Sequence, residues 1–274
     1  MNNMLDATIL IDNIASGDLI SEWGFAICVT YNGKKYLLDT GGSGKYLDNA
    51  RKLGISIDEV DVAVLSHAHY DHSGGYGSFF KVNSKAQLYV SENCCEDCYF
   101  KIGPVRKYVG FPRGVLAAND SRINRVAGFA KIDDGVYIVP HLKNNLERIG
   151  KKAHMYRKVD GRVIPDDFSH EQSLVFETDK GLVVLNSCSH GGLHNILADV
   201  NHFLPGKSVH MTIGGLHLAA ASNKDVREIA ATISKLSIEH VITGHCTGKR
   251  AYKILKEELG DKVSQMHVGM KINV

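Results

Sequence analysis

The stretch "LSHAHYDHSGGYG", residues 65 to 77, places three histidines and one aspartate within six consecutive positions and follows them with glycines. When such side chains are buried, they must be paired with one another or bound to a cation, and exposed ones have no reason to cluster. A divalent metal ion satisfies all four at once. We therefore predict that the motif binds zinc, with iron or manganese as alternatives, through His67, His69, Asp71 and His72.

The residues before the motif explain how these side chains converge. "VDVAVLS" is an apolar, β-branched run, which is typical of a strand buried on both faces, and it should end near Ser66. His67 and His69 are two residues apart in a chain that is still extended, so both can project to the same side. The motif is therefore predicted to lie on a loop at the end of a buried strand, where a rigid scaffold usually presents its chemistry.

This H-x-H-x-D-H pattern resembles the signature of the metallo-β-lactamase superfamily. The resemblance implies an α/β fold, an αββα sandwich of two mixed sheets with helices outside and a one- or two-metal site along one edge. Further stretches are similar to the subgroup that contains the archaeal dihydropterin-ribofuranosylaminobenzene 5′-phosphate synthases and many bacterial relatives of unassigned substrate. They are "LLDTGGSGKYLDNARKLGI", "DDFSHEQSLVFETDKGLVVLNSCSHGGLHNI", "IGGLHL" and "ITGHCTG".

Length and composition agree with an enzyme of this class. The chain has 274 residues, of which 44% are hydrophobic, enough to bury a sizeable core, and we interpret residues 1–274 as one domain. No basic leader precedes a long apolar run, and no apolar run has the length of a membrane span, so we expect a soluble, cytoplasmic protein without a membrane partner. Its six cysteines, Cys94, Cys95 and Cys98 among them, are then expected to be thiols.

The hydrophobic pattern alternates between strands and helices in both halves, which indicates sheets covered by helices. A hairpin is predicted at Asn32-Gly33. Further strands are expected at 86–91, 172–178, 181–187, 209–215 and 240–244, and helices at 43–55, 192–204, 223–236 and 249–260.

Residues 99 to 163 differ from both halves. They contain 14 Lys and Arg against five Asp and Glu, a net charge of +9 in a chain whose total is +2. We interpret the segment as an irregular insertion that covers or flanks the metal site, with a solvated basic surface as the alternative. The residues expected to attract an anionic substrate are Arg106, Lys107, Arg113, Arg122 and Arg125.

The remaining metal ligands should come from the second half. His190 in "NSCSHGG" and His245 in "ITGHCTG" each follow a buried strand, as the first motif does, and both match the family. We predict two sets of ligands, His67, His69 and His190 for one ion, and Asp71, His72 and His245 for the other.

Five further residues complete the predicted site. His217 is expected to contact substrate or donate a proton, and Asp39 to orient a ligand without binding metal. His170 and Glu171 are alternatives to His190 as ligands. Cys188 stands where many members of the family have a bridging aspartate, and we expect its thiol within a few ångströms of the site. The histidines assigned to structural or surface positions are His141, His154, His194, His202, His210, His240 and His267.

These residues predict a metal-dependent hydrolase, or a related synthase, that acts on a small anionic, phosphorylated substrate. Asp71 would orient the reactive water or accept its proton. A nuclease or phosphodiesterase of the same fold is the first alternative, although basic and aromatic residues are not closely interleaved and nucleic acid is not the expected partner. A non-catalytic metal or ligand sensor is the second. The sequence does not determine the oligomeric state.

Overall fold

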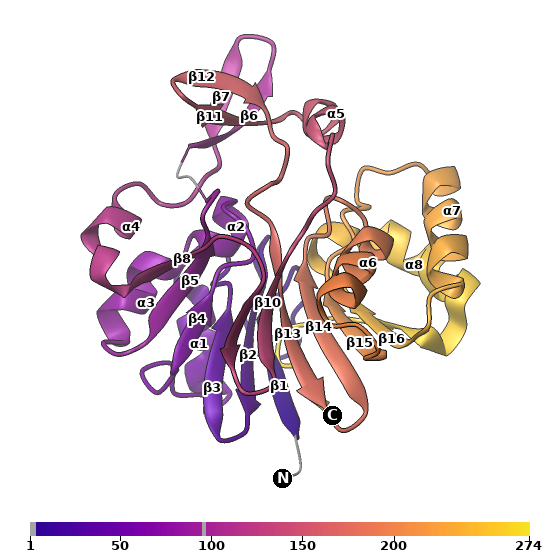
Figure 1. Cartoon of the computed structure of the whole chain (residues 1–274), viewed down its shortest axis with the longest axis horizontal. Helices are drawn as coiled ribbons and strands as arrows, with labels where there is room; N and C mark the ends of the chain where they lie inside the picture. The colour runs from indigo at the N-terminus through magenta and orange to yellow at the C-terminus, as the bar shows by residue number, and fades with distance from the viewer. Residues whose placement is uncertain (1–3, 95–96) are drawn as a thin grey trace.

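The computed structural model describes residues 4–94 and 97–274, and Cys95 therefore lies outside the described residues. Two seven-stranded sheets form its centre (Figure 1). In spatial order, the first sheet contains β18 (Lys271–Asn273), β1 (Leu5–Ile11), β2 (Ala26–Tyr31), β3 (Lys34–Leu38), β4 (Val62–Val64), β5 (Gln87–Ser91) and β8 (Ile123–Val126). The second contains β17 (Val263–Gln265), β16 (Ile238–Thr243), β15 (Val209–Gly214), β14 (Gly181–Ser187), β13 (Gln172–Thr178), β10 (Val136–Pro140) and β9 (Ala130–Asp133).

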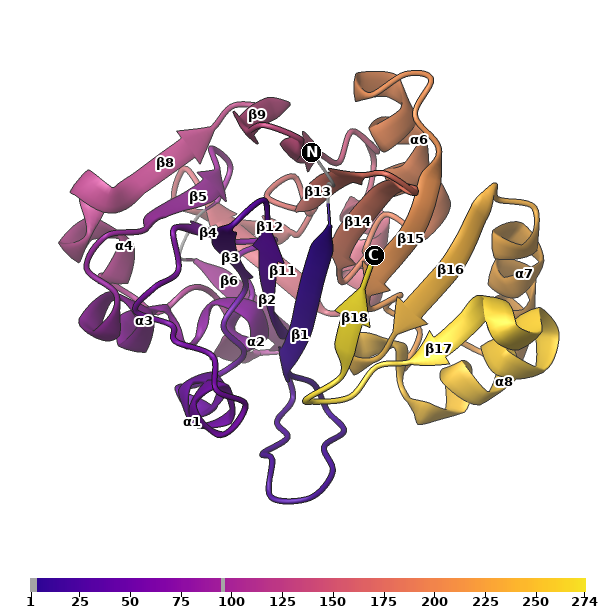
Figure 2. The ribbon, with the colours of Figure 1, turned by 90° about the horizontal axis from the view of Figure 1, so that it is seen from below.

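Helices cover the outer faces of both sheets (Figure 2). On the first sheet these are α1 (Lys45–Lys52) and α3 (Tyr76–Val82), and on the second α6 (Leu193–Phe203), α7 (Asn223–Ser234) and α8 (Lys249–Leu259). Three buried apolar clusters fill the spaces between the resulting four layers, with the middle cluster between the two sheets. The predicted αββα sandwich is therefore confirmed.

The local sequence signals correspond to these elements. Asn32 and Gly33 both have positive φ, 49° and 78°, as a two-residue hairpin turn between β2 and β3 requires. β3, β4 and β5 are parallel neighbours, and so are β14, β15 and β16. Because the carboxyl ends of parallel strands meet at one edge of a sheet, the loops that carry the predicted ligands lie together.

The segment 99–163 is not irregular, which corrects the prediction. β8 extends the first sheet, and β9 and β10 extend the second. The four remaining strands form a separate small sheet, which stands above the edge of the sandwich (Figure 1). That small sheet contains β12 (Arg162–Pro165), β11 (Met155–Val159), β6 (Cys98–Ile102) and β7 (Val105–Tyr108). The short helices α4 (Val115–Ala118) and α5 (Glu147–Lys152) complete the segment. The charged strands of this sheet have no simple apolar alternation, which is why their pattern did not predict them.

Every helix within the described ranges is too short or too polar to cross a membrane.

Candidate metal centre

The predicted ligands meet where the two sheets adjoin. Short helix α2 (Tyr70–Ser73) follows β4 and presents the second half of the motif, and the single turn His245–Thr247 follows β16. His67, His69, His72, His190 and His245 are all buried, with at most 5% of each residue exposed. Five imidazoles without bulk water are unfavourable unless each ring is hydrogen-bonded or bound to a cation.

One group consists of His67, His69 and His190, whose ligand nitrogens all lie within 4.8 Å of one another. The Nδ1 atom of His67 lies 2.9 Å from the Ser66 hydroxyl oxygen. Its Nε2 atom is buried and has no hydrogen-bond partner among residues 4–94 and 97–274. A buried imidazole nitrogen without a partner, facing two further imidazoles, fits a metal ion at this position.

Carboxylates hold the outer sides of the other two rings. Glu171 Oε1 lies 2.9 Å from His190 Nδ1, and Asp166 Oδ2 lies 3.2 Å from His69 Nε2. In metal sites such carboxylates fix the tautomer and the orientation of the ligand ring. The two contacts leave Nε2 of His190 and Nδ1 of His69 as the atoms available to a metal ion.

The second group is centred on His72 and His245, whose Nε2 atoms are 3.2 Å apart. The Nδ1 atom of each ring lies next to an acceptor oxygen, that of Asp39 at 2.7 Å and that of Asn13 at 3.2 Å. In neutral rings with the hydrogen on Nδ1, the two Nε2 atoms face each other without hydrogen, and a metal ion bound by both would remove their repulsion. Their separation is close to the value of about 3.3 Å expected between two nitrogen ligands on tetrahedral zinc.

A thiol and a carboxylate adjoin this second pair. Cys188 Sγ lies 3.2 Å from His72 Nε2, so the predicted proximity of this cysteine to the site is present. Asp71 Oδ2 lies 3.4 Å from His245 Nε2. The arrangement offers two imidazoles, one carboxylate and one thiol to a second ion.

Asp39 organises this half of the site. Its Oδ2 atom lies 2.6 Å from Ser66 Oγ, 3.0 Å from Ser187 Oγ and 2.7 Å from His72 Nδ1. Its Oδ1 atom accepts the Ser66 backbone N–H at 2.8 Å. Asp39 therefore orients His72 directly and reaches His67 through Ser66, which matches the role predicted for it.

The electrostatics favour neutral imidazoles in the first group. Burial, together with the neighbouring histidines, lowers the pKa of His67 well below its ordinary value. Burial also lowers the pKa of His190 to about 4, although Glu171 opposes the shift. A neutral imidazole is the form that binds metal, so both rings are in the state that a ligand requires.

In the second group the carboxylate is ionised. Burial alone would raise the pKa of Asp71, but the close contact with His245 and the charge of His72 outweigh burial and lower it. Burial would likewise lower the pKa of His245, but the contact with Asp71 produces a net rise. The site therefore holds a negative oxygen where a cation would bind.

His170 is close to the site without facing a metal position. Its Nδ1 atom accepts the Ala68 backbone N–H at 3.2 Å, so the hydrogen of the neutral ring is on Nε2, which lies 3.2 Å from Asp166 Oδ2. His170, His69, Asp166 and Cys98 have ligand atoms within 4.8 Å of one another. Because Nε2 of His170 carries hydrogen, this group is better described as hydrogen-bonded support for His69 than as a further metal site.

Glu171, the other alternative to His190, faces two histidines. Its Oε2 atom lies 3.1 Å from His141 Nδ1, and its Oε1 atom contacts His190. Burial would raise the pKa of Glu171, but the charges of His190 and His141 lower it well below its usual range. His141, for which the sequence predicts a structural or surface position, thus contacts Glu171, which in turn contacts the candidate ligand His190. Its position just after β10 was the available signal.

The ring of His217 lies against the site, with its centroid 4.4 Å from that of His190. Its backbone N–H points to Cys246 Sγ at 3.3 Å. Cys188, His245 and Cys246 also have ligand atoms within 4.8 Å of one another. Sequence reasoning did not identify Cys246, although it is adjacent to a predicted ligand in "GHCTG".

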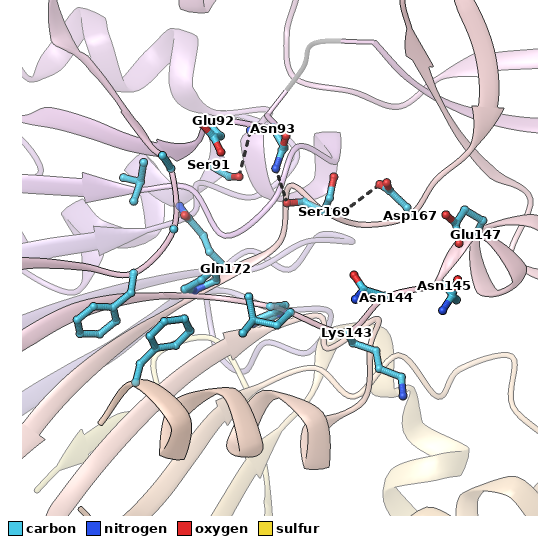
Figure 3. A pocket seen from close by; sticks show the side chains of 18 residues that line it. Ser91, Glu92, Asn93, Lys143, Asn144, Asn145, Glu147, Asp167, Ser169 and Gln172 are labelled. Atoms are coloured by element: carbon cyan, nitrogen blue, oxygen red, sulfur yellow. Dashed lines mark hydrogen bonds between the residues drawn. The ribbon is translucent and has the colours of Figure 1, made fainter. Parts of the chain in front are cut away.

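His141 is also part of the wall of a cavity of about 740 Å³. Figure 3 shows this cavity with the side chains that line it, among them Lys143, Asp167 and Gln172. Its described charged lining residues are three carboxylates and one lysine, namely Glu92, Glu147, Asp167 and Lys143. The five basic residues predicted to attract substrate do not line it.

The five basic residues of the predicted wall lie in different surroundings. The Arg122 guanidinium donates to the backbone oxygens of Asn83 and Ala86, before β5, and is therefore at the opposite end of the strands from the motif. Arg125 donates to the Cys94 backbone oxygen, and the guanidinium groups of Arg106 and Arg113 lie over tyrosine rings of the small sheet. The Nζ atom of Lys107 lies 5.9 Å from the ring centre of Tyr70, a residue of the motif.

Comparisons with known proteins agree with this geometry. A family model described as the metallo-beta-lactamase superfamily matches residues 24–194. A protein of Methanocaldococcus jannaschii named 7,8-dihydropterin-6-methyl-4-(beta-D-ribofuranosyl)-aminobenzene-5'-phosphate synthase is 28% identical over 265 residues, which cover 89% of this chain and 87% of that protein.

Solved structures are similar as well. Tm1679, described as a metal-dependent hydrolase of the beta-lactamase superfamily, is 30% identical with a TM-score of 0.84, over 98% of this chain and 99% of its own. Zn(2+)-bound PqqB from Methylobacterium extorquens is 10% identical with a TM-score of 0.57, over 98% of this chain and 100% of its own, which shows similarity of fold alone.

Proposed function

Because the chain belongs to the metallo-β-lactamase superfamily, we propose that it is a metal-dependent hydrolase with a two-ion centre. The observation that carries the proposal is the buried Nε2 atom of His67, which lacks a partner among the described residues and faces two further imidazoles. His67, His69 and His190 would hold one ion. Asp71, His72 and His245 would hold the second, with Cys188 beside it.

The donor set favours zinc, with iron or manganese as alternatives. Imidazole and thiolate are suited to zinc and ferrous iron, whereas carboxylate also suits manganese. A thiolate from Cys188, in place of the bridging aspartate of many family members, would strengthen the preference for the softer ions. We place the protein in the cytoplasm, where a thiol stays reduced.

When bound, the ions would lower the pKa of a coordinated water and stabilise negative charge on the substrate. Asp71, ionised and held at its Oδ2 atom, would orient the attacking water. Glu171 and Asp166 would keep the rings of His190 and His69 in the tautomers that bind metal. His217, beside His190, would hold a proton near the leaving group.

We propose a small anionic, phosphorylated molecule as substrate. A two-ion centre attracts anions, and the relative from Methanocaldococcus jannaschii is named as a synthase of a ribofuranosyl phosphate compound. The same centre would therefore serve hydrolysis or the related synthase displacement. The acidic cavity near His141 does not contribute to phosphate binding in this proposal, because its described lining offers one lysine against three carboxylates.

Metal analysis of the purified protein, with a turnover screen on phosphate esters, lactones and thioesters, tests the proposal. We expect up to two ions per chain, and turnover of a phosphate ester. His67→Ala should fold normally and lose metal and activity together, while His194→Ala, an exposed histidine on α6, should keep both. A His67→Ala protein that retains metal and turnover contradicts the assignment.

A further inference from the structure

Trp23 is the only tryptophan of the chain, and half of its surface is exposed. It lies between β1 and β2 and belongs to none of the three apolar clusters found among the described residues. A large aromatic side chain gains little stability when it is half exposed, so core packing does not explain its position.

A hydrogen bond from the Trp23 indole explains the position of this side chain. The indole Nε1–H donates to Asp71 Oδ2 at 2.9 Å, and the same oxygen lies 3.4 Å from His245 Nε2. The ring of Trp23 also lies against that of His245, with centroids 5.2 Å apart. One tryptophan thus contacts two members of the second candidate ligand set.

The loop that carries Trp23 is fixed to the same groups. The backbone N–H of Phe25 donates to the Asp71 backbone oxygen at 3.1 Å. A Cβ atom at Gly24 would lie 2.6 Å from that oxygen, so only glycine allows the approach. Asn13, at the start of the loop, accepts the Gly24 N–H and contacts His245 Nδ1, both at 3.2 Å. The loop therefore holds Trp23 at a defined place relative to both ligands.

We infer that Trp23 is a positioning residue of the second metal ion, acting through its N–H on the Asp71 carboxylate. This inference rests on the proposed metal centre. A carboxylate can rotate about its side-chain bonds, and a fixed donor on Oδ2 keeps that oxygen directed at His245. Because partners that orient ligands contribute strongly to metal affinity, loss of the N–H should weaken the second ion selectively.

Trp23→Phe removes the N–H and keeps an aromatic ring. We expect the second zinc ion to bind about 10- to 100-fold more weakly, with the first unchanged, in competition with a chromophoric chelator. The visible spectrum of the Co²⁺-loaded protein should change in the component from the second ion. Tyr252→Phe is the matched control, since Tyr252 and Trp23 both line a cavity of about 200 Å³ beside His245, and the Asp71 carboxylate accepts its hydrogen bond from Trp23 and not from Tyr252.

A second measurement needs no variant. Because Trp23 is the only tryptophan, its emission should change as zinc is titrated into the metal-free wild-type protein, with the stoichiometry of the second ion. Unchanged emission, or a Trp23→Phe protein with wild-type affinity and Co²⁺ spectrum, overturns the inference while leaving the metal centre intact. A wild-type protein that binds no ion at His72 and His245 overturns the proposed function itself, and the inference with it.

Discussion

At the scale of single residues, the candidate centre consists of proposed ligands and of the side chains that orient them. Asp39, Asp166, Glu171 and Asn13 each hold the outer nitrogen of a different histidine. Such contacts determine which ring nitrogen carries the hydrogen and which one remains for a metal ion. The motif residues alone would be flexible side chains on a loop, and these partners give them one orientation.

Asp39→Asn tests this orientation. The amide has nearly the same shape, but it replaces a charged acceptor that faces His72 Nδ1 and two serine hydroxyls. We expect affinity for the second ion to fall about 10- to 100-fold, with little change in secondary structure by circular dichroism. Asp6→Asn, at an exposed position of β1, is the control and should bind metal as the wild type does. Equal affinities in the two variants would show that Asp39 is dispensable.

At the scale of elements, the turn after β4 depends on close backbone packing. Gly74 ends α2, which carries Asp71 and His72, and a Cβ atom there would lie 2.3 Å from the Gly42 carbonyl oxygen. That distance is far below van der Waals contact, and the neighbouring atoms are backbone, so they cannot rotate away. The position of α2, which carries two of the three proposed ligands of the second ion, therefore depends on the absence of a side chain at Gly74.

Gly74→Ala should displace α2 or the loop at Gly42. We expect destabilisation of about 1–3 kcal/mol, as for other overpacked sites, together with weaker metal binding. Gly77→Ala, within α3, is the matched control, because its Cβ would lie 3.7 Å from the Val115 side chain on α4, an ordinary contact. Chemical denaturation and metal titration of both variants measure the effects. A Gly74→Ala protein as stable as Gly77→Ala would mean that the turn adapts.

At the scale of the whole molecule, the two sheets are joined by an apolar layer at one end and by the polar centre at the other. Phe176 on β13 packs against the rings of Tyr31 and Tyr36, with centroids 5.3 and 5.2 Å away. The centre in turn draws residues from both sheets, including Asp39 after β3 and Ser187 at the end of β14. A substitution in the apolar layer should therefore lower stability without affecting metal binding, whereas one in the polar centre should affect metal binding.

Phe176→Ala should destabilise the fold by about 3–5 kcal/mol, because it opens a cavity in the middle layer. Metal stoichiometry should stay that of the wild type, since Phe176 is near the end of β13 away from the site. Phe100→Ala, at a residue 36% exposed on the small sheet, should cost much less. Urea denaturation combined with metal analysis separates the two variants, and loss of metal from Phe176→Ala would contradict this division.

Removal of the metal should lower stability, because the ions bind the folded chain and not the same site in the unfolded one. At a free ion concentration 100 times Kd, each site contributes about 2.7 kcal/mol. We expect a chelator to lower Tm and added zinc to restore it. The His67→Ala variant should show a smaller response than wild type, and an equal response in both would indicate zinc bound elsewhere.

The sequence by itself determined the fold class and most of the candidate ligands. The H-x-H-x-D-H motif, the strand-end histidines His190 and His245 and the periodic strands all carry local signals, because ligands and buried strands need specific residue types at specific spacings. The small sheet did not carry such a signal, since its strands are charged and its two hairpins are joined by β6 and β11, which lie some 50 residues apart in the chain.

The tertiary structure alone decided which groups orient the ligands. Trp23 meets Asp71 across 48 residues and Asn13 meets His245 across 232, so no local pattern could pair them. The same holds for the basic residues of 99–163. Their net charge can be counted from the sequence, but the direction in which each side chain points depends on how the neighbouring strand is paired. Arg122 points to Asn83 because β8 pairs in parallel with β5, and that pairing places it at the end of the sheet away from the metal centre. The charge of this segment is therefore set by its sequence, whereas the direction of its basic side chains is set by the packing of the strands.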